Sequence, residues 1–404
     1  MDKKNTTYDF TIIGGGLIGS LVSVLLSRNG FKCCLVERNS LAKMSDLKKF
    51  SPLSLNYRSI QILKKFDLWD KEVIEASPIR NLTMKCFNSL NRLKFSSSDV
   101  NLRYLGYIVN KFLLHNYFID IAKKQEGLDI FENSSVTELE YIKNQTSCLI
   151  KTSSKELKKI HSKFTILSDG EPSELKEKLG FKTSYDYHNQ TSYMIDCEAK
   201  IEVGAAVQLF NQDGIFALIP YSTNKTSLIL SLNDENKDKY INEKNQVSVE
   251  HIHKIFSNYL ENIKEIRIIS SYKLKSSKSK EIIKDNVLLL GNTSQLLHPV
   301  GAQGFNLGLR NIESVIDLLN RKTNLKEEDI SKKMNQVGVI IRNDRKDILQ
   351  MTDIATNFLA SSKSIPRIIS SLMINFLKIS QKSKLKFLKK VLGIDNCSYL
   401  TIKG

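Results

Sequence analysis

The hydrophobic pattern of the N-terminal region predicts a strand–helix–strand unit. Residues 8–13 (YDFTII) and 31–37 (FKCCLVE) are short apolar runs of the kind found in buried parallel strands. Residues 20–30 (SLVSVLLSRNG) lie between them and predict an apolar helix that ends at Gly30. Two such strands joined by a helix predict a βαβ unit and a parallel sheet.

Later hydrophobic stretches, separated by turn residues, predict a mainly antiparallel sheet. They cover residues 81–87, 93–96, 192–199, 205–210, 215–221 and 226–233. An Asp213-Gly214 turn precedes residues 215–221, which either line a substrate cavity or are plain sheet core. A strand over 282–290 and an amphipathic helix over 311–320 follow, and the chain beyond Asn320 has a helical pattern.

Composition limits the class of protein. A chain of 404 residues favours two connected domains, and 41% hydrophobic with 25% charged residues is typical of a globular protein. No apolar run reaches the roughly 18–20 residues that span a bilayer. The first ten residues, MDKKNTTYDF, lack the apolar core of a secretory signal. We expect a cytoplasmic protein, at most peripheral on the inner face of the cytoplasmic membrane.

The net charge of +17 comes largely from Lys residues scattered among Asn, Ser and Ile. No nucleic-acid-binding motif accompanies them, so we expect no nucleic-acid partner. The six cysteines have no metal-ligand spacing, and the histidines are few and dispersed, so we expect no metal. Buried hydrophobic packing in a reducing compartment is the favoured interpretation of the cysteines.

A glycine-rich turn links the first strand to its helix. Gly14 permits a tight turn, Gly16 lets the backbone approach a pyrophosphate, and Gly19 allows helix and strand to pack closely. The helix N-terminus attracts phosphate groups. Glu37 ends the second strand about 20 residues further on, where a carboxylate can bind ribose hydroxyls. An acid there argues against the 2′-phosphate of NADP and leaves NAD and FAD open.

Two further segments indicate which of these two cofactors binds. Residues 291–310 (GNTSQLLHPVGAQGFNLGLR) and residues 168–173 (SDGEPS) follow the glycine turn in chain order. Together the three motifs resemble those of the para-hydroxybenzoate-hydroxylase-like flavoprotein monooxygenases. Within that superfamily the chain most resembles the ubiquinone-biosynthesis hydroxylases, in particular the octaprenyl-methoxyphenol hydroxylase branch. The likeness runs from about residue 8 to about residue 315.

The resemblance assigns roles to individual residues. Asp169 would lie near the flavin pyrophosphate in a motif implicated in nicotinamide nucleotide binding. Asn292 would bond a ribityl or ribose hydroxyl, Pro299 would wall the isoalloxazine, and the helix beginning near Gly304 would stabilise negative charge on reduced flavin. The predicted cofactor-binding residues are Gly14, Gly16, Leu17, Ile18, Gly19, Glu37, Arg38, Asp169, Gly291, Asn292, Pro299, Gly301, Gly304, Phe305 and Asn306.

Two residues are candidates for catalysis, and each has an alternative. His298 could orient or deprotonate a substrate phenol, or it could be a packed loop residue. Gln303 could contact flavin or substrate, or simply pack in its turn. The family's flavin-contacting Arg has no counterpart, since Ser51 aligns there with Lys48 and Lys49 upstream. A Lys supplies a point charge without the planar fork of Arg.

The predicted fold class is α/β, with a Rossmann-type FAD-binding domain, an interleaved mainly antiparallel β-sheet substrate domain and a helical C-terminal region. The FAD-binding domain is predicted from three parts, 1–77, 109–182 and 281–325. The substrate domain takes residues 78–108 and 183–280, and the basic helical region residues 326–404.

The resemblance implies an FAD-dependent enzyme that hydroxylates a polyprenylated phenol in ubiquinone biosynthesis. NAD(P)H would be the electron donor and molecular oxygen the oxidant, with a flavin C4a-hydroperoxide delivering the hydroxyl. Two alternatives remain open: a flavin-dependent prenyl-lipid reductase, and a non-catalytic flavoprotein subunit of a lipid-synthesis complex. Membership of a ubiquinone-biosynthesis complex is a further expectation.

The C-terminal region is basic and amphipathic. Residues 354–394 contain no Asp or Glu and eight cations, the first of them Lys363, among apolar stretches. Such helices suit an anionic membrane surface, and an insoluble prenyl substrate would make that placement sensible. The alternative is a helix packed on the protein body with a solvated Lys face.

Overall fold

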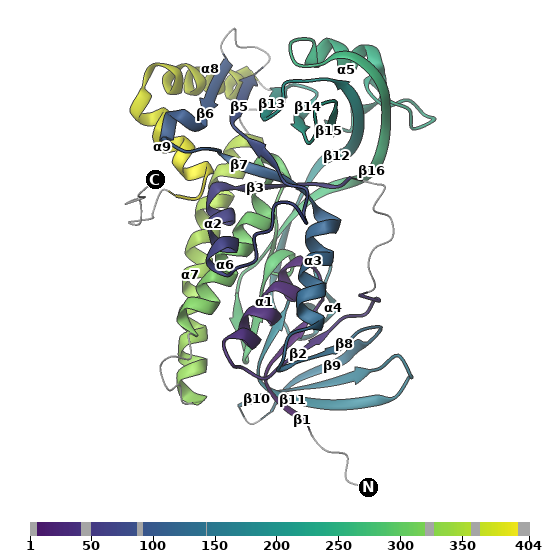
Figure 1. Ribbon diagram of the computed structural model, residues 1–404, viewed down its shortest axis with the longest axis vertical. Helices are drawn as coiled ribbons and strands as arrows, with labels where there is room; N and C mark the ends of the chain where they lie inside the picture. Colours follow the sequence, from purple (N-terminus) through teal and green to yellow (C-terminus); the bar gives the residue numbers. More distant parts are fainter. Residues whose placement is uncertain are drawn as a thin grey trace.

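In the computed structural model of the protein, two large β-sheets carry helices packed on them (Figure 1). The structure describes residues 6–41, 50–86, 92–142, 144–319, 327–356 and 364–394. Lys48, Lys49, Lys363 and Cys397 lie outside these ranges. Sheets with helices on their faces are the predicted α/β class, and this prediction is confirmed.

The first sheet is parallel at its centre. β1 (Thr6–Ile13) lies between β11 (Leu157–Leu167) and β2 (Cys33–Val36), and both neighbours run parallel to it. β8 (Leu128–Phe131) pairs with β2 and β18 (Val287–Leu289) with β11, again in parallel. Because parallel strands end at one edge, the loops that follow β1, β2, β11 and β18 all start from the same edge.

The predicted single strand over 282–290 is wrong. β17 (Ile283–Lys284) and β18 form an antiparallel hairpin instead. Asp285 and Asn286 connect them with φ of 49° and 57°. Asp and Asn tolerate this left-handed conformation, which a two-residue hairpin turn requires. On the same side of β11 as β18, but along its first half, β10 (Gln145–Lys151) pairs antiparallel with β11, and β9 (Ser135–Ile142) pairs antiparallel with β10.

The second sheet has eight strands and is mainly antiparallel, as predicted. In order across the sheet they are β19 (Gln295–Leu296), β16 (Glu261–Ser279), β12 (Thr183–Lys200), β15 (Lys225–Asn233), β14 (Gly214–Pro220), β13 (Ala205–Asn211), β5 (Asn81–Cys86) and β6 (Arg92–Ser96). Only the β13–β5 pair is parallel among the described neighbours. β16 was not predicted, because most of its side chains are exposed and no apolar alternation marks it.

A small third sheet and a helix connect the two large ones. β7 (Gly106–Asn110) pairs antiparallel with both β3 (Pro52–Asn56) and β4 (Ser77–Ile79). α2 (Tyr57–Lys65) follows β3 directly, and the Asn56 side chain accepts from Ser59 N to cap its start.

The main hydrophobic core of the described residues lies between the first sheet and five helices: α1 (Leu17–Arg28), α2, α3 (Lys111–Lys123), α6 (Gln303–Leu318) and α7 (Glu327–Ile354). A separate core lies between the second sheet and α5 (Val249–Phe256). Five cysteines, Cys33, Cys34, Cys86, Cys148 and Cys197, are buried thiols, as predicted for packing residues.

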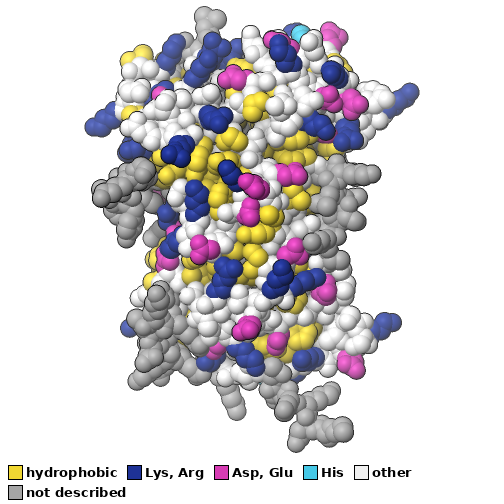
Figure 2. Space-filling view, viewed as in Figure 1, with side chains coloured by type: hydrophobic (Ala, Val, Ile, Leu, Met, Phe, Trp, Pro, Cys, Tyr) yellow, Lys and Arg dark blue, Asp and Glu magenta, His cyan; other side chains and the backbone are white. Residues whose placement is uncertain are grey.

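The C-terminal region is helical, as predicted. α8 (Ser364–Ile379) and α9 (Gln381–Val391) lie beside β5 and β6, at the end of the molecule opposite the start of β1 (Figure 1). None of the described helices is long and apolar enough to cross a membrane. Figure 2 shows broad hydrophobic areas on one face of the upper half, among scattered Lys and Arg.

Candidate cofactor site

The turn between β1 and α1 is built so tightly that two of its residues must be glycine. Gly14 has a φ of +101°, and a Cβ there would lie 2.5 Å from Ser168 O. A Cβ on Gly19 would lie 1.8 Å from Gly14 O. Both distances are far below van der Waals contact, so any side chain would push helix and strand apart.

Gly16 is different, because it faces open space. Among the described residues, no atom lies within 4 Å of the position of its Cβ. Gly16 is also the N-cap of α1, and the first turn of the helix carries no acid and no side-chain cap from the described part of the chain. The N-terminal N–H groups and the positive end of the helix dipole therefore remain available to an anionic ligand such as a pyrophosphate.

Glu37 lies against this turn, at the end of β2. Its Oε2 accepts from Gly15 N at 2.6 Å and its Oε1 from Asn39 N at 2.9 Å. Arg38 beside it is exposed. His115, which the sequence analysis did not single out, lies on α3 with Nε2 2.8 Å from Gly15 O. The turn is thus fixed from two sides by side chains distant in sequence.

The second glycine-rich segment meets the first at Ile18. A Cβ on Gly291 would lie 3.1 Å from Ile18 Cγ1, and a Cβ on Gly308 would lie 2.5 Å from Ile18 Cδ1. Gly291 precedes the exposed Asn292, and Gly308 lies in α6. Close packing on one isoleucine brings the start of α1 and the start of α6 to the same place.

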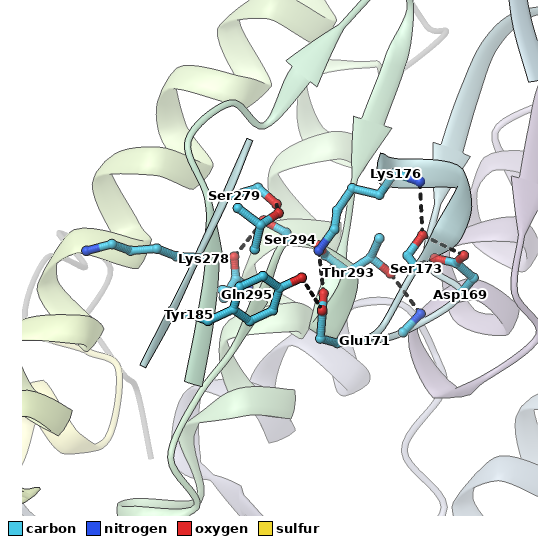
Figure 3. A network of polar contacts seen from close by, with 12 residues as sticks. Asp169, Glu171, Ser173, Lys176, Tyr185, Lys278, Ser279, Thr293, Ser294 and Gln295 are labelled. Carbon is cyan, nitrogen blue, oxygen red and sulfur yellow. Dashed lines mark hydrogen bonds and ion pairs between the residues drawn. The ribbon is translucent and has the colours of Figure 1, made fainter. Parts of the chain in front are cut away.

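Asp169 connects the middle motif to the same region (Figure 3). Its carboxylate accepts from Ser173 Oγ at 2.8 Å and from Thr293 Oγ1 at 3.1 Å. Gly170 N donates to Thr293 Oγ1 at 2.8 Å. Burial raises the pKa of Asp169, against the opposing effect of these hydrogen bonds. Thr293, which the sequence analysis missed, is the residue that ties the two motifs together.

A buried ion pair lies beneath this connection. Lys176 of α4 (Glu174–Lys178) is fully buried and pairs with the equally buried side chain of Glu171. Lys176 Nζ also lies 3.3 Å from Thr293 O, and Tyr185 OH donates to Glu171 Oε1 at 2.9 Å (Figure 3). Because Lys176 Nζ donates to Thr293 O, the pair holds the Thr293 backbone against α4. Removing either member of the pair would leave an uncompensated buried charge.

The start of α6 combines unusual backbone with open space. Gly301 and Ala302 have φ of +69° and +51°. No described atom lies within 4 Å of a Cβ placed on Gly304. Gln303 Nε2 donates to Gly301 O at 3.1 Å, while its Oε1 is buried and has no hydrogen-bond partner in the described part of the chain. A buried acceptor without a partner is costly, and an N–H group of a ligand would satisfy it.

The side chain of Asn306 makes all of its hydrogen bonds within the protein. Its Oδ1 accepts from Asn56 N and Ser59 Oγ, at 3.0 and 2.6 Å, and its Nδ2 donates to Ser54 O and Ala302 O, at 2.9 and 2.7 Å. The side chain therefore fastens α6 to β3 and α2. Any cofactor contact predicted for Asn306 would have to come from its backbone.

His298 is similarly engaged. Its Nδ1 accepts from Val300 N at 3.1 Å, and its Nε2 lies 3.0 Å from Gln190 Oε1. Gln190 Nε2 in turn donates to Asn233 Oδ1 at 2.7 Å. Burial, and to a smaller extent His188, lowers the pKa of His298 to about 3. The neutral ring links the loop around Pro299 to β12 and β15 of the second sheet.

The position of the missing Arg is only partly described. Ser51 O accepts from Lys111 N at 2.8 Å, which attaches the start of β3 to α3. Lys48 and Lys49 lie outside the described residues, so substitution of the Arg by either Lys stays a prediction. Phe305 packs half-buried against the main core, and Pro299 precedes the short 3-10 turn of residues 300–302.

The three converging segments define a dinucleotide-binding flavoprotein fold. The sequence profile of the family described as "FAD binding domain" matches residues 7–323. The chain therefore belongs to the FAD binding domain family, and the family predicted from the sequence is confirmed. The residues present fit the cofactor: an uncapped helix start at Gly16, a carboxylate at Glu37, and open space with an unpaired acceptor at the start of α6.

Curated relatives of the chain carry names from ubiquinone biosynthesis. It is 22% identical over 386 residues to "Ubiquinone biosynthesis monooxygenase COQ6, mitochondrial" of Dictyostelium discoideum, covering 79% of this chain and 77% of the relative. It is 22% identical over 320 residues to "3-demethoxyubiquinol 3-hydroxylase" of Escherichia coli strain K12, covering 78% and 80%.

Solved structures show the same fold. p-Nitrophenol 4-monooxygenase PnpA from Pseudomonas putida DLL-E4 superposes with a TM-score of 0.76 at 14% identity, over 97% of this chain and 99% of that one. The myxobacterial chondrochloren halogenase CndH superposes with a TM-score of 0.72 at 16% identity, over 97% and 91%. Together with the family match, the relatives agree with an FAD-dependent oxidoreductase of the aromatic-hydroxylase kind.

Proposed function

We propose that the chain hydroxylates the aromatic ring of a polyprenylated phenol in ubiquinone biosynthesis, with bound FAD, NAD(P)H as electron donor and molecular oxygen as oxidant. The observation that carries the proposal is the meeting of Gly14, Asp169 and Gly291 around Ile18 and Thr293 in a member of an FAD-binding family. The names of the curated relatives supply the pathway and the phenolic substrate class.

The overall reaction balances with these reactants. NAD(P)H gives up a hydride and, with a proton, supplies two electrons. One atom of the oxygen molecule enters a ring C–H bond as a hydroxyl, and the other leaves as water. Reduced FAD supplies the oxygen-activating chemistry when it is bound, and the protein supplies orientation, electrostatics and exclusion of water.

The residues at the start of α6 provide the electrostatic part. The N-terminal N–H groups of the helix around Gly304 offer partial positive charge to an electron-rich ring. Gln303 Oε1 is the unpaired acceptor that a ligand N–H group would satisfy. Pro299 lacks an N–H and contributes an apolar ring to the loop that leads into this helix. We assign Gln303 to cofactor or substrate contact.

His298 acts through position rather than through proton transfer. Both of its ring nitrogens are already engaged, by Val300 N and Gln190 Oε1. A neutral imidazole with a pKa of about 3 is a weak base at neutral pH. We infer that His298 holds the Pro299 loop at a fixed distance from the substrate sheet. Its predicted role as a base for the phenol would require one of these hydrogen bonds to break.

The substrate side is apolar where the sheet meets the loop. Phe210 and Ile215, from the β13–β14 hairpin, form one cluster with Cys86 and Val300. The neighbouring side chains Phe216 and Leu218 point to the other core, beneath α5. An apolar wall next to the cofactor loop suits an aromatic ring with a prenyl chain. We extend the proposal to a peripheral position on the inner face of the cytoplasmic membrane and to membership of a ubiquinone-biosynthesis complex.

Oxygen consumption tests the proposal. Purified protein with FAD and NAD(P)H should consume oxygen when a prenylated phenol is added, and the product should have gained one oxygen atom. Reduction of a prenyl double bond without oxygen uptake would identify a reductase instead. Bound flavin that NAD(P)H does not reduce would identify a non-catalytic flavoprotein. Profiling quinone intermediates in a deletion strain would then name the ring position, because the precursor of the missing step accumulates.

A further inference from the structure

Helix α8 exposes an unusual number of large apolar side chains. They are Ile369, Leu372, Met373, Phe376 and Ile379, which are 38%, 62%, 36%, 61% and 85% exposed. Their spacing of three, one, three and three residues places them on one face of the helix. Single exposed hydrophobic residues are ordinary, but a continuous row along a helix marks an interaction surface.

The opposite side of α8 is firmly packed. Ile374 is 4% exposed and belongs to the cluster of Phe210, Ile215 and Val300. Leu377 packs against the cluster that contains Phe95 and Leu388. The helix is therefore seated on the second sheet and on the cofactor loop, and its exposed row is not a loosely attached segment.

Helix α9 directly follows α8, and all of its charged residues are lysines. Lys382, Lys386 and Lys389 are exposed on it, and residues 364–394 contain no Asp or Glu. Lys384 pairs with Asp99 at 2.9 Å and so holds α9 to the body of the protein. An apolar row next to unopposed cations matches a layer of hydrocarbon beneath anionic headgroups.

Helix α8 packs against the loop of the proposed cofactor site. Ile374 and Val300 share one apolar cluster, and Val300 follows Pro299 of the cofactor loop. Figure 1 shows α8 and α9 together at the outer end beside β5 and β6, and Figure 2 shows hydrophobic and basic side chains in the same upper left region. A prenyl chain that leaves the second sheet on this side would reach the surface that the apolar row of α8 contacts.

We propose that α8 is an interfacial helix whose apolar row enters the surface of an anionic lipid bilayer, with the lysines of α9 on the headgroups. This deepens the peripheral membrane position of the proposed function, and delivery of the substrate by the bilayer rests on the proposed hydroxylation, whereas the docking can be measured without any substrate. The occupant is a lipid surface rather than a second copy of the chain, because the lysines of two copies would face one another across such an interface.

Vesicle sedimentation of the full FAD-loaded chain tests the docking. The test variant is Leu372→Gln with Phe376→Gln, which removes the two largest side chains in the middle of the row. The matched control is Val339→Gln with Ile340→Gln on α7, whose side chains are 55% and 42% exposed outside the proposed surface. The probes are vesicles of phosphatidylcholine alone and with phosphatidylglycerol.

The wild type should bind the phosphatidylglycerol vesicles and release them at high salt. The test variant should lose about thirtyfold in partition coefficient, since each side chain forfeits roughly half of a full apolar burial. The α7 control should bind as the wild type does. Lys382→Gln, Lys386→Gln and Lys389→Gln together should abolish the preference for anionic vesicles.

Three outcomes would overturn the docking: no binding to either vesicle, unchanged binding by the α8 variant, or a stable dimer in solution that only the α8 variant abolishes. Flavin content and hydroxylation of a water-soluble phenol, measured in parallel without lipid, should be the same in wild type and α8 variant. Failure of the hydroxylation leaves the sedimentation result intact, so the two proposals fail separately.

Discussion

The protonation of His298 gives a quantitative test of the site. Its imidazole is 3% exposed, and both ring nitrogens are engaged with Val300 and Gln190. Burial, with a smaller effect of His188, lowers the pKa of His298 from 6.5 to about 3. The ring should therefore stay neutral in the folded protein throughout the range in which the unfolded chain takes up a proton.

This difference determines how stability depends on pH. Below about pH 6.5, His298 is protonated in the unfolded chain, whereas in the folded chain it stays neutral down to about pH 3. The unfolded state then carries more protons, so the free energy of unfolding falls as pH falls, by about 1.4 kcal/mol per pH unit. Above about pH 6.5 His298 adds no pH dependence. Between about pH 6.5 and 5 its contribution is a loss of about 2 kcal/mol.

Urea denaturation of wild type and His298→Gln across this range measures the effect. The variant should show a shallower acid slope than the wild type, by about 1.4 kcal/mol per pH unit. His253→Gln, which removes an exposed imidazole of α5, is the control, and His188 is present in all three proteins. Equal slopes for wild type and His298→Gln would refute the neutral, buried His298.

Three further predictions concern the cofactor turn and the buried pair. Gly19→Ala should lower the free energy of unfolding by about 3 kcal/mol or more, because its Cβ would lie 1.8 Å from Gly14 O; unchanged urea denaturation would count against the packing. Lys176→Met should cost about 3–5 kcal/mol by leaving the Glu171 charge buried alone, and adding Glu171→Gln should recover most of it; equal stability of single and double variants in thermal melts would disprove the coupling. Glu37→Gln should weaken FAD binding about tenfold in a fluorescence titration, and wild-type affinity would exclude a ribose contact.

The sequence predicts the dinucleotide-binding unit well because each of its parts has a local signal. Gly14, Gly16 and Gly19 have the spacing that a strand–turn–helix needs, and Glu37 ends the next strand. The fixed glycines and prolines of residues 291–308 are equally visible. What brings these segments together is Ile18, an ordinary helix residue whose role depends on contacts across the fold.

Other parts of the site have no local signal. Lys176 lies in ELKEK, which reads as a solvated helix, and only the fold shows that it is buried with Glu171. The hydrogen bonds from His298 to Gln190 and on to Asn233 likewise join residues far apart in the chain. β16 escapes prediction because its exposed residues give no alternation, whereas the Asp285-Asn286 turn had a signal that could have divided the predicted strand.

We propose that two glycine segments, distant in the chain, hold one FAD between them. Gly16→Val and Gly304→Leu test it, since no described atom lies within 4 Å of a Cβ at either position, and we expect both variants to fold. Titration of FAD into each purified apoprotein, with a thermal melt to verify folding, is the measurement. One FAD should bind per wild-type chain, and both folded variants should bind FAD much more weakly. Full binding by either folded variant, or no FAD bound by the wild type, would contradict it.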